Sequence, residues 1–273
     1  MIAIGKVALW GVGAAVLVYL ALLGALFWFQ RDFFYPAPKE IPVQPAGYED
    51  VRIATADGLT LRAFYRPARP GLPTLIFFHG NGSDIAGSDR ATRVLAAQGY
   101  GVLLPEYRGY GGNPGAPSEL GLYRDGATAV AWLVAKDIPT NRIVAIGNSL
   151  GSGVATEVAA RERLAGLVLI SGFASLPRVA RDHYPFIPAE LLVRDRYDNI
   201  AKLPSVACPI LLLHGTADSV VDIGNSRALA IRQPSARLEI ITGVGHELAY
   251  LPISQARIIA WLRRGAMQGR PSL

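Results

Sequence analysis

A serine flanked by two glycines stands between a strand pattern and a helix pattern near the middle of the chain. Residues 143–146 are β-formers, a Gly-x-Ser-x-Gly motif occupies residues 147–151, and the small residues 154–161 are compatible with a helix. In a strand–turn–helix of this kind, the glycines leave room for a close helix–strand approach, and the serine hydroxyl is held above the sheet. The motif alone is a weak signal, but in this context it predicts that Ser149 is a nucleophile.

A serine hydroxyl is a poor nucleophile at neutral pH, so this prediction requires a base, a group that orients the base, and donors for an oxyanion. The chain carries polar groups at the ends of three further apolar runs that are typical of buried strands. These are residues 74–78 before His79-Gly80-Asn81-Gly82, residues 210–213 before His214 to Asp218, and residues 238–241 before Thr242 to His246. Open α/β sheets bind their ligands at the carboxyl ends of their strands, so we expect these groups to meet at one site.

The expected catalytic roles follow from the residue types and their order. Ser149, Asp218 and His246 occur in the order nucleophile, acid, histidine, which differs from the order in chymotrypsin and in subtilisin. We expect His246 to take the proton of Ser149, and Asp218 to hold the imidazole in the productive tautomer. The backbone N–H groups of Leu150 and Asn81 are expected to form the oxyanion hole.

Several of these residues have an alternative structural role. Ser149 could serve only as a helix N-cap, and Asp222 competes with Asp218 for the acid role, although Asp222 is better placed to cap the next helix. His79 and His214 are expected to brace loops by hydrogen bonds. No histidine stands with acidic residues at zinc-site spacing, and no Gly-rich dinucleotide fingerprint opens a βαβ unit. The sequence therefore predicts neither a metal nor a cofactor.

The size and charge of the chain limit the classes of protein to consider. With 273 residues and 51% hydrophobic content, the chain can bury one sizeable core. The formal net charge is +6, but no basic run with interleaved aromatic residues and no nucleic-acid recognition motif accompanies it. We therefore expect no nucleic acid partner and assign the excess charge to contact with anionic lipid. Nothing in the sequence indicates the oligomeric state.

The amino-terminal end is expected to be a membrane anchor. Residues 7–29 carry no charge and exceed the roughly 20 residues that a helix needs to cross a bilayer. A cleaved signal peptide is the alternative, but the run is too long, and bulky aromatic residues stand where small ones should precede a cleavage site. We assign residues 1–30 to a single transmembrane helix. Lys6 on one side is nearly balanced by Arg31 and Lys39 on the other, so the membrane side of the remaining chain stays open.

The rest of the chain is expected to form one folded unit behind a short linker. Residues 31–47 are rich in proline, which predicts an extended, semi-rigid spacer. Residues 48–273 then alternate between strand and helix patterns, beginning with a β-hairpin in which Asp57 is expected to be a turn residue and nothing more. The next helix is expected at residues 89–98.

The alternation lapses after the helix that follows the serine motif. The segment 173–204 combines prolines, aromatic residues and arginines, and it interrupts a run of parallel strands. We expect it to form a small cap that lines an acyl pocket and presents arginines to lipid headgroups. An ordinary long crossover with solvated arginines is the alternative.

Five short motifs together resemble those of a known superfamily. They are His79-Gly80-Asn81-Gly82, Tyr107-Arg108-Gly109-Tyr110-Gly111, Gly147-Asn148-Ser149-Leu150-Gly151, His214-Gly215-Thr216-Ala217-Asp218 and Gly245-His246. In this order they resemble the α/β-hydrolase superfamily, and more narrowly its N-terminally anchored abhydrolase-domain lipases, lysophospholipases and protein depalmitoylases. The resemblance covers about residues 48–264. Glu106, Asn113 and Glu247 depart from the pattern, because relatives commonly have Asp, Ser and Asn there.

The resemblance implies an α/β fold with an eight-stranded, mostly parallel sheet whose second strand is antiparallel, flanked by helices. It also implies a membrane-anchored serine hydrolase that cleaves acyl esters or thioesters of lipid-like substrates through an acyl-enzyme. The expected partners are therefore the bilayer and a lipid or acylated substrate. An aminopeptidase-like hydrolase is the first alternative, and a non-catalytic membrane-bound scaffold on a hydrolase frame is the second.

Overall fold

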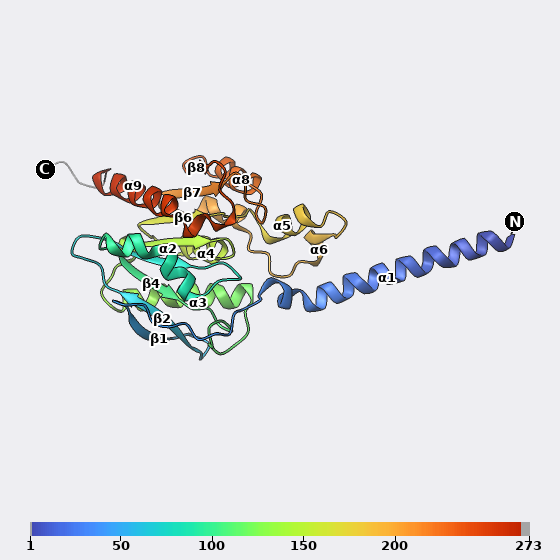
Figure 1. The fold of residues 1–273 in the computed structure, drawn as a ribbon, viewed down its shortest axis with the longest axis horizontal. Coiled ribbons are helices and arrows are strands. Elements are labelled where there is room, and N and C mark those ends of the chain that lie inside the picture. Colours follow the sequence, from blue (N-terminus) through green and yellow to red (C-terminus); the bar gives the residue numbers. More distant parts are fainter. Residues whose placement is uncertain (1, 269–273) are drawn as a thin grey trace.

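Eight strands form one sheet in the computed structural model, which describes residues 2–268 (Figure 1). The strand order is β1-β2-β4-β3-β5-β6-β7-β8. β2 is antiparallel to β1 and β4, and the remaining neighbours are parallel. The strands are β1 (Glu49–Ala54), β2 (Thr60–Arg66), β3 (Thr74–Phe78), β4 (Gly101–Pro105), β5 (Ile143–Asn148), β6 (Gly166–Ile170), β7 (Ile210–Gly215) and β8 (Arg237–Ile241). The predicted mostly parallel sheet with an antiparallel second strand is confirmed.

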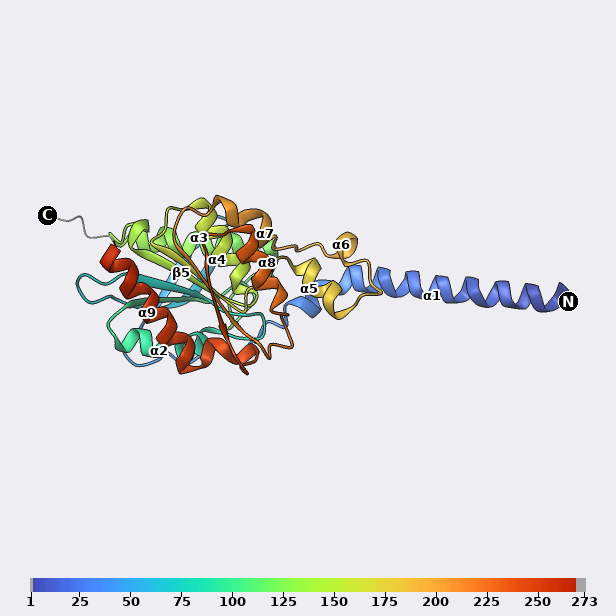
Figure 2. The ribbon, with the colours of Figure 1, turned by 90° about the horizontal axis from the view of Figure 1, so that it is seen from above.

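Helices cover both faces of this sheet. α2 and α9 pack on one face, while α3, α4 and α8 pack on the other, and Figure 2 shows the two groups on opposite sides of the strands. The helices are α1 (Ile2–Phe34), α2 (Ile85–Ala97), α3 (Glu119–Val134), α4 (Gly151–Arg161), α5 (Leu176–His183), α6 (Ala189–Leu192), α7 (Asn199–Lys202), α8 (Gly224–Arg232) and α9 (Pro252–Gln268). Short 3₁₀ turns lie at Thr140–Arg142, Leu203–Ser205 and His246–Tyr250.

The five central strands are buried along their whole length. Every residue of β3, β4, β5, β6 and β7 is buried, because helices on both faces exclude water. Apart from Thr74 at the start of β3, these strands therefore read as apolar runs, and polar side chains appear near their carboxyl ends. This burial fixes the positions of the loops at the carboxyl edge.

One helix begins earlier than the sequence predicts. α2 starts at Ile85 rather than at residue 89, because Asp84 takes the N-cap position and its carboxylate accepts a hydrogen bond from the Gly87 amide at 2.9 Å. Asp84 satisfies an amide that the first turn leaves without a helical partner. The apolar spacing alone misses this first turn, whose start is set by the Asp84 N-cap.

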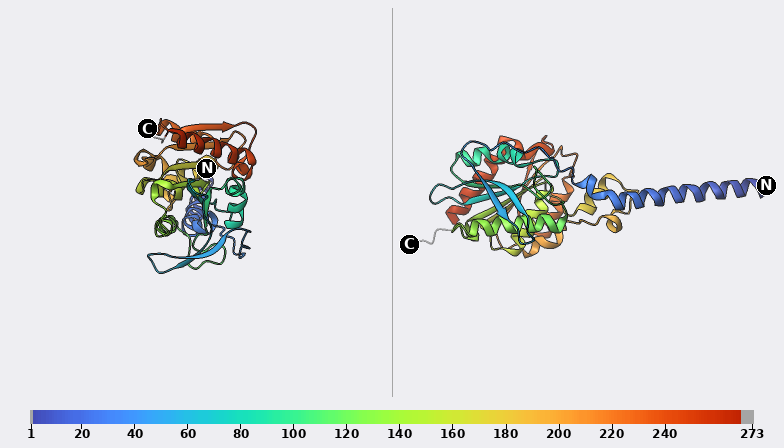
Figure 3. Two further views of the ribbon diagram at one scale, coloured as in Figure 1. Left: turned by 90° about the vertical axis from the view of Figure 1, so that its left-hand side faces the viewer. Right: turned by 90° about the horizontal axis from the view of Figure 1, so that it is seen from below.

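α1 is a long apolar helix that projects away from the sheet (Figures 1 and 3). Among the described residues, one helix is long and apolar enough to cross a membrane, and its qualifying part is Trp10–Phe34, with a mean hydropathy of 2.3. The helix continues past residue 30, the expected end of the anchor. Its last turns therefore reach the body of the molecule as a continuous helix.

The segment that follows α1 lies against the folded body. Tyr35 and Ala37 are buried, the Lys39 ammonium donates to the carbonyl of Gly109 at 2.6 Å, and the Gly111 amide donates to the carbonyl of Pro38 at 2.8 Å. These contacts start directly after the helix ends. The proline-rich segment thus fixes the end of α1 relative to the sheet.

Residues 173–204 form the cap. They contain α5, α6 and α7 and lie between β6 and β7. Figures 1 and 2 show α5 and α6 extending from the sheet toward the carboxyl-terminal half of α1. The cap and the long helix therefore meet on the side of the molecule where α1 leaves it.

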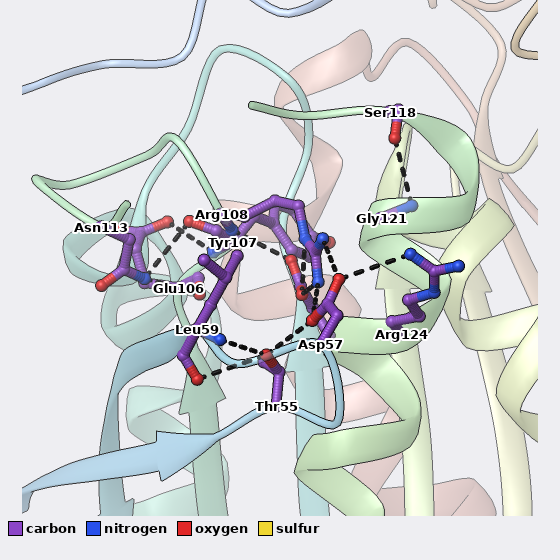
Figure 4. Close-up of polar contacts among 11 residues, drawn as sticks. Thr55, Asp57, Leu59, Glu106, Tyr107, Arg108, Asn113, Ser118, Gly121 and Arg124 are labelled. Carbon is purple, nitrogen blue, oxygen red and sulfur yellow. Dashed lines mark hydrogen bonds and ion pairs between the residues drawn. The ribbon is translucent and has the colours of Figure 1, made fainter. Parts of the chain in front are cut away.

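A buried arginine ties the first hairpin to α3 (Figure 4). Arg108 donates to the carboxylate of Asp125 at 2.7 and 2.9 Å and to that of Asp57 at 2.8 Å, and its side chain is largely buried. Arg124 contacts the same Asp57 carboxylate at 3.4 Å. The expectation that Asp57 is only a turn residue is therefore wrong. Local turn chemistry could not show its partners, because they lie far along the chain.

Candidate active site

Ser149 sits at the apex of a sharp turn between β5 and α4. Its φ angle is +50°, a left-handed conformation that a non-glycine residue rarely adopts. A Cβ atom on Gly151 would lie 2.0 Å from the carbonyl oxygen of Phe78, and one on Gly147 would lie 2.4 Å from the carbonyl oxygen of Gly151. The two glycines are therefore required for the backbone to pass so closely. The strained turn places the hydroxyl at the carboxyl edge of the sheet.

The structure brings Ser149, His246 and Asp218 together from three separate loops. The Ser149 Oγ lies 3.1 Å from the His246 Nε2, and the His246 Nδ1 lies 2.9 and 3.1 Å from the two carboxylate oxygens of Asp218. A carboxylate accepts hydrogen bonds, so Nδ1 carries the proton and Nε2 is free to accept from the serine hydroxyl. The three residues form one continuous hydrogen-bonded chain.

The Asp218 carboxylate is held in place by the backbone as well as by the histidine. The amides of Val220 and Val221 each donate to its Oδ1 at 2.9 Å. Burial on its own raises the pKa of Asp218, but the hydrogen bonds from His246 and from the Val221 amide outweigh it and lower the pKa to about 2. The carboxylate is therefore ionised at neutral pH and available to orient the imidazole.

Asp222, the alternative acid, and His214, whose Nε2 lies 3.5 Å from Asp218 Oδ2, both have structural roles. The Asp222 carboxylate accepts from the Gly224 amide at the start of α8 at 2.7 Å. His214 is fully buried, donates from Nε2 to the carbonyl of Val221 at 2.8 Å, and has its Nδ1 2.7 Å from the hydroxyl of Ser226. Burial lowers the pKa of His214. Both residues therefore brace the loop that carries Asp218.

A second histidine fixes the loop after β3. The Nδ1 of His79 donates to the carbonyl of Gly80 at 2.8 Å, and its Nε2 lies 2.8 Å from the Glu106 carboxylate. Both side chains are fully buried, and Glu106 also accepts from the Ile85 amide at 3.1 Å. The carbonyl of Gly80 accepts a further hydrogen bond from the Ser83 amide at 3.1 Å. The orientation of the Gly80–Asn81 peptide is therefore determined.

This peptide carries one of the expected oxyanion donors. The C=O and N–H of a trans peptide point in opposite directions, so an anchored carbonyl on Gly80 turns the Asn81 N–H away from His79. Asn81 and Leu150 line the same cavity as Ser149. Within the described part of the chain, neither amide donates a hydrogen bond to another backbone or side-chain group. Both are available to an oxygen bound beside the serine.

The cavity above Ser149 is apolar and has a volume of about 590 Å³. That volume falls within the range of roughly 300–1,000 Å³ that is usual for small-molecule sites. Most of its lining residues belong to the cap and to α1. They include Leu26, Phe27, Phe33 and Phe34 from α1, and Leu176, Val179, Tyr184, Phe186, Ile187 and Leu192 from the cap.

The departures from the family pattern have clear local roles. Glu106 holds His79, and Asn113 accepts from the Arg62 amide at 2.9 Å while donating to the carbonyl of Glu106. Glu247 accepts from the Gly245 amide and, among the described residues, makes no hydrogen bond to the His246 ring. The described residues also contain no group of three or more His, Cys, Asp or Glu side chains placed to hold a metal ion.

Comparison with known proteins agrees with this fold. A sequence profile of the alpha/beta hydrolase family matches residues 75–199. The chain is 40% identical over 228 residues to Rv2307c, an uncharacterized protein of Mycobacterium tuberculosis, and the match covers 80% of each chain. It is 29% identical over 240 residues to the alpha/beta hydrolase domain-containing protein WAV2 of Arabidopsis thaliana, covering 78% of this chain and 77% of WAV2.

A solved structure gives the same result for the fold. The esterase Pf2001 of Pyrococcus furiosus superposes with a TM-score of 0.69 at 20% sequence identity, covering 84% of this chain and 96% of that chain. A hydrolase is the class of protein that this fold and site define. The chain belongs to the α/β-hydrolase family, and the predicted abhydrolase-type membership is confirmed.

Sequence reasoning missed the residues that connect α1 to the site. The side-chain amide of Asn81 donates to the carbonyl of Phe34 at 3.2 Å, so the last turn of α1 contacts the loop after β3. Gln30 is buried although it lies in an apolar helix. A polar residue inside a candidate membrane span was the available signal that this part of the helix has a protein partner.

Proposed function

We propose that this protein is a membrane-anchored serine hydrolase that cleaves acyl ester or thioester bonds of lipid-like substrates. The observation that carries the proposal is the hydrogen-bonded chain from the Ser149 hydroxyl through His246 to Asp218, with 3.1 Å between Ser149 Oγ and His246 Nε2. Nucleophile, base and orienting carboxylate at these distances are the arrangement that activates a serine hydroxyl.

The first half of the reaction acylates the serine. His246 takes the proton of Ser149 as the oxygen attacks the acyl carbonyl, and the ionised Asp218 stabilises the imidazolium that forms. The resulting oxyanion accepts hydrogen bonds from the backbone amides of Leu150 and Asn81. One such donor contributes about 2.7–4 kcal/mol to lowering the barrier in serine hydrolases. His246 then gives its proton to the leaving alcohol or thiol.

The second half releases the acid. His246 takes a proton from water, the water oxygen attacks the acyl-enzyme carbonyl, and the same oxyanion donors stabilise the second tetrahedral intermediate. The bond between the acyl carbon and Ser149 Oγ then breaks, and Oγ takes up the proton that His246 carries. Atoms balance with water as the only co-reactant, so the residues in place support the whole cycle.

The cavity supports an acyl substrate. Its lining is dominated by Leu, Val, Ile and aromatic side chains, and the lining residues include no Asp or Glu. An aminopeptidase must bind the positively charged amino terminus of its substrate, and an apolar wall without a carboxylate offers no partner for that charge. The acyl-ester reading is therefore preferred over the peptidase alternative.

The long helix supports the membrane-anchored part of the proposal. The span Trp10–Phe34 has 25 residues, which is enough to cross a hydrocarbon core of about 30 Å at 1.5 Å per residue. Exposed apolar side chains such as Trp10, Leu17 and Leu20 cover its surface. A bilayer would remove these side chains from water.

The test is hydrolysis of a p-nitrophenyl ester by the full-length protein in detergent or vesicles. Wild-type protein should release p-nitrophenol, Ser149→Ala should reduce the rate to background, and the matched Ser152→Ala should retain activity. Ser152 is a neighbouring buried serine whose hydroxyl bonds to Asn199. Equal rates for wild type and Ser149→Ala would contradict the proposal, and an inert but folded wild type would favour the scaffold alternative.

A further inference from the structure

We propose that α1 is one wall of the acyl-binding pocket, and that the acyl chain of a membrane lipid reaches Ser149 directly from the bilayer, between α1 and the cap helices. The inference rests on the proposed function and deepens it. It assigns the membrane helix a part in substrate selection, beyond holding the protein at the membrane.

The end of α1 is held against the cap by partly buried polar contacts. Arg31 donates to both carboxylate oxygens of Asp195 at 2.9 Å, and Asp195 is only 4% exposed. The Gln30 side chain donates to the carbonyl of Leu192 at 3.1 Å and accepts from the Arg194 amide at 2.8 Å. The helix is therefore held at a fixed position beside the cap.

A contact further along α1 sets how deep the cap reaches. The hydroxyl of Tyr19 donates to the carbonyl of Phe186 at 2.7 Å, so the tip of the cap lies beside the middle of the helix. Tyr19 lies inside Trp10–Phe34, the part of α1 that is long and apolar enough to cross a membrane. If this part lies in the hydrocarbon core, the tip of the cap that contacts Tyr19 lies in the lipid as well.

The side chains at this tip match a lipid environment. Phe186 and Leu191 of the cap are 68% and 84% exposed, and Trp28 and Phe33 of α1 are 76% and 68% exposed. Soluble monomeric proteins rarely expose a large apolar patch. Phe33 and Phe186 also line the pocket, and Figures 1 and 3 show the cap helices α5 and α6 beside α1, on the side of the molecule where α1 leaves it.

The pocket joins this patch to the serine. Leu26, Phe27 and Phe33 of α1 line the same cavity as Ser149. An acyl group whose carbonyl lies at Ser149 therefore extends its chain against the helix. A short acyl group ends near the serine, whereas a long one contacts α1, so the helix should select by chain length.

The experiment uses full-length protein in phosphatidylcholine vesicles and measures kcat/KM for a palmitoyl and a butyryl ester. Leu26→Trp fills the pocket from the helix side and should lower the palmitoyl-to-butyryl ratio by about tenfold or more, because each lost methylene contact in a hydrophobic pocket costs about tenfold or more in specificity. The ratio cancels any loss that both substrates share. Leu20→Trp is the matched control, since Leu20 is 55% exposed on α1 and does not line the pocket; it should keep the wild-type ratio.

A second arm distinguishes a bilayer lipid from a dissolved acyl compound. A long-chain glycerolipid ester should be hydrolysed when it shares vesicles with the protein and should be spared when it is confined to protein-free vesicles. An unchanged ratio in Leu26→Trp, or equal hydrolysis of the ester in both kinds of vesicle, would overturn the inference. A wild type that hydrolyses neither ester contradicts the proposed function itself, so the two failures are told apart.

Discussion

The floor and the roof of the cavity are built in different ways. The floor consists of Ser149, His246 and the amides of Leu150 and Asn81, and each follows a strand of the central sheet. The roof consists of α1 residues 26–34 and the cap, which contribute apolar side chains and are joined by a few polar contacts. The sheet therefore fixes the positions of the triad and the amides, whereas elements outside the sheet shape the cavity above them.

The largest effect is expected at Asp218, the carboxylate that orients His246 in the floor. Asp218→Asn should reduce kcat by about 10⁴-fold, the loss seen when the corresponding aspartate of a serine protease is replaced, because the imidazole then adopts the wrong tautomer. The matched Asp222→Asn should change kcat far less, since Asp222 bonds only to the start of α8 among the described contacts. Steady-state ester hydrolysis by both variants checks this. Similar losses in the two variants would show that the acid has been misassigned.

A smaller loss of kcat is expected at Glu106, which holds His79 and the loop that carries the Asn81 amide. Glu106→Gln weakens the hold on His79 and on the Gly80–Asn81 peptide, so kcat should fall by as much as about 100-fold. KM should change less than kcat, because the oxyanion forms only in the transition state. Glu106→Asp should recover part of the rate. The control is Glu247→Gln. A kcat loss in this variant as large as in Glu106→Gln would contradict the proposed positioning role of Glu106.

A substitution at Asp195 should loosen the contact between α1 and the cap without changing the triad. Asp195→Asn weakens hydrogen bonds to a charged group that contribute about 1.5–3 kcal/mol each, so the cap should separate from α1 more often. The palmitoyl-to-butyryl ratio should fall severalfold, and limited proteolysis should cut residues 184–193 faster. The control Asp89→Asn removes an exposed ion pair with Arg93 that contributes about 0.5 kcal/mol or less. It should change neither the palmitoyl-to-butyryl ratio nor the rate of proteolysis. Unchanged proteolysis in Asp195→Asn would argue against a fastened roof.

The smallest effect on activity is expected at Asp125, whose described hydrogen bonds go to Arg108 and not to the triad. Asp125→Asn leaves the buried Arg108 with a weaker set of acceptors and should destabilise the fold by about 3 kcal/mol. The kcat of the folded variant should stay within about twofold of wild type, because sites that share no partner act independently. Thermal unfolding and ester hydrolysis check the two parts. A large kcat loss in folded protein would mean that this cluster and the floor are coupled.

The floor was largely readable from the sequence. Apolar runs before His79, Asp218 and His246 predict parallel strands, and the carboxyl ends of such strands meet at one edge. The chain order of Ser149, Asp218 and His246 then suggests the roles. The structure brings these three side chains within hydrogen-bond distance.

The packing of α1 against the cap could not be predicted from the sequence in the same way. Leu26 and Phe186 belong to segments far apart in the chain, and their meeting depends on the packing of α1 against the cap. Asp195 and Arg31 likewise carry no local signal that they pair. Hydrophobic periodicity describes one element at a time, so it predicts a membrane span for α1 without predicting what lies beside it.

The most direct test of the central claim is active-site labelling of the full-length protein with a fluorophosphonate, followed by mass spectrometry of the modified peptide. We expect one covalent adduct on Ser149, absent in Ser149→Ala and formed much more slowly in His246→Ala, because the histidine activates the hydroxyl. The absence of any adduct on folded wild-type protein, or equal labelling of Ser149→Ala, would contradict the account.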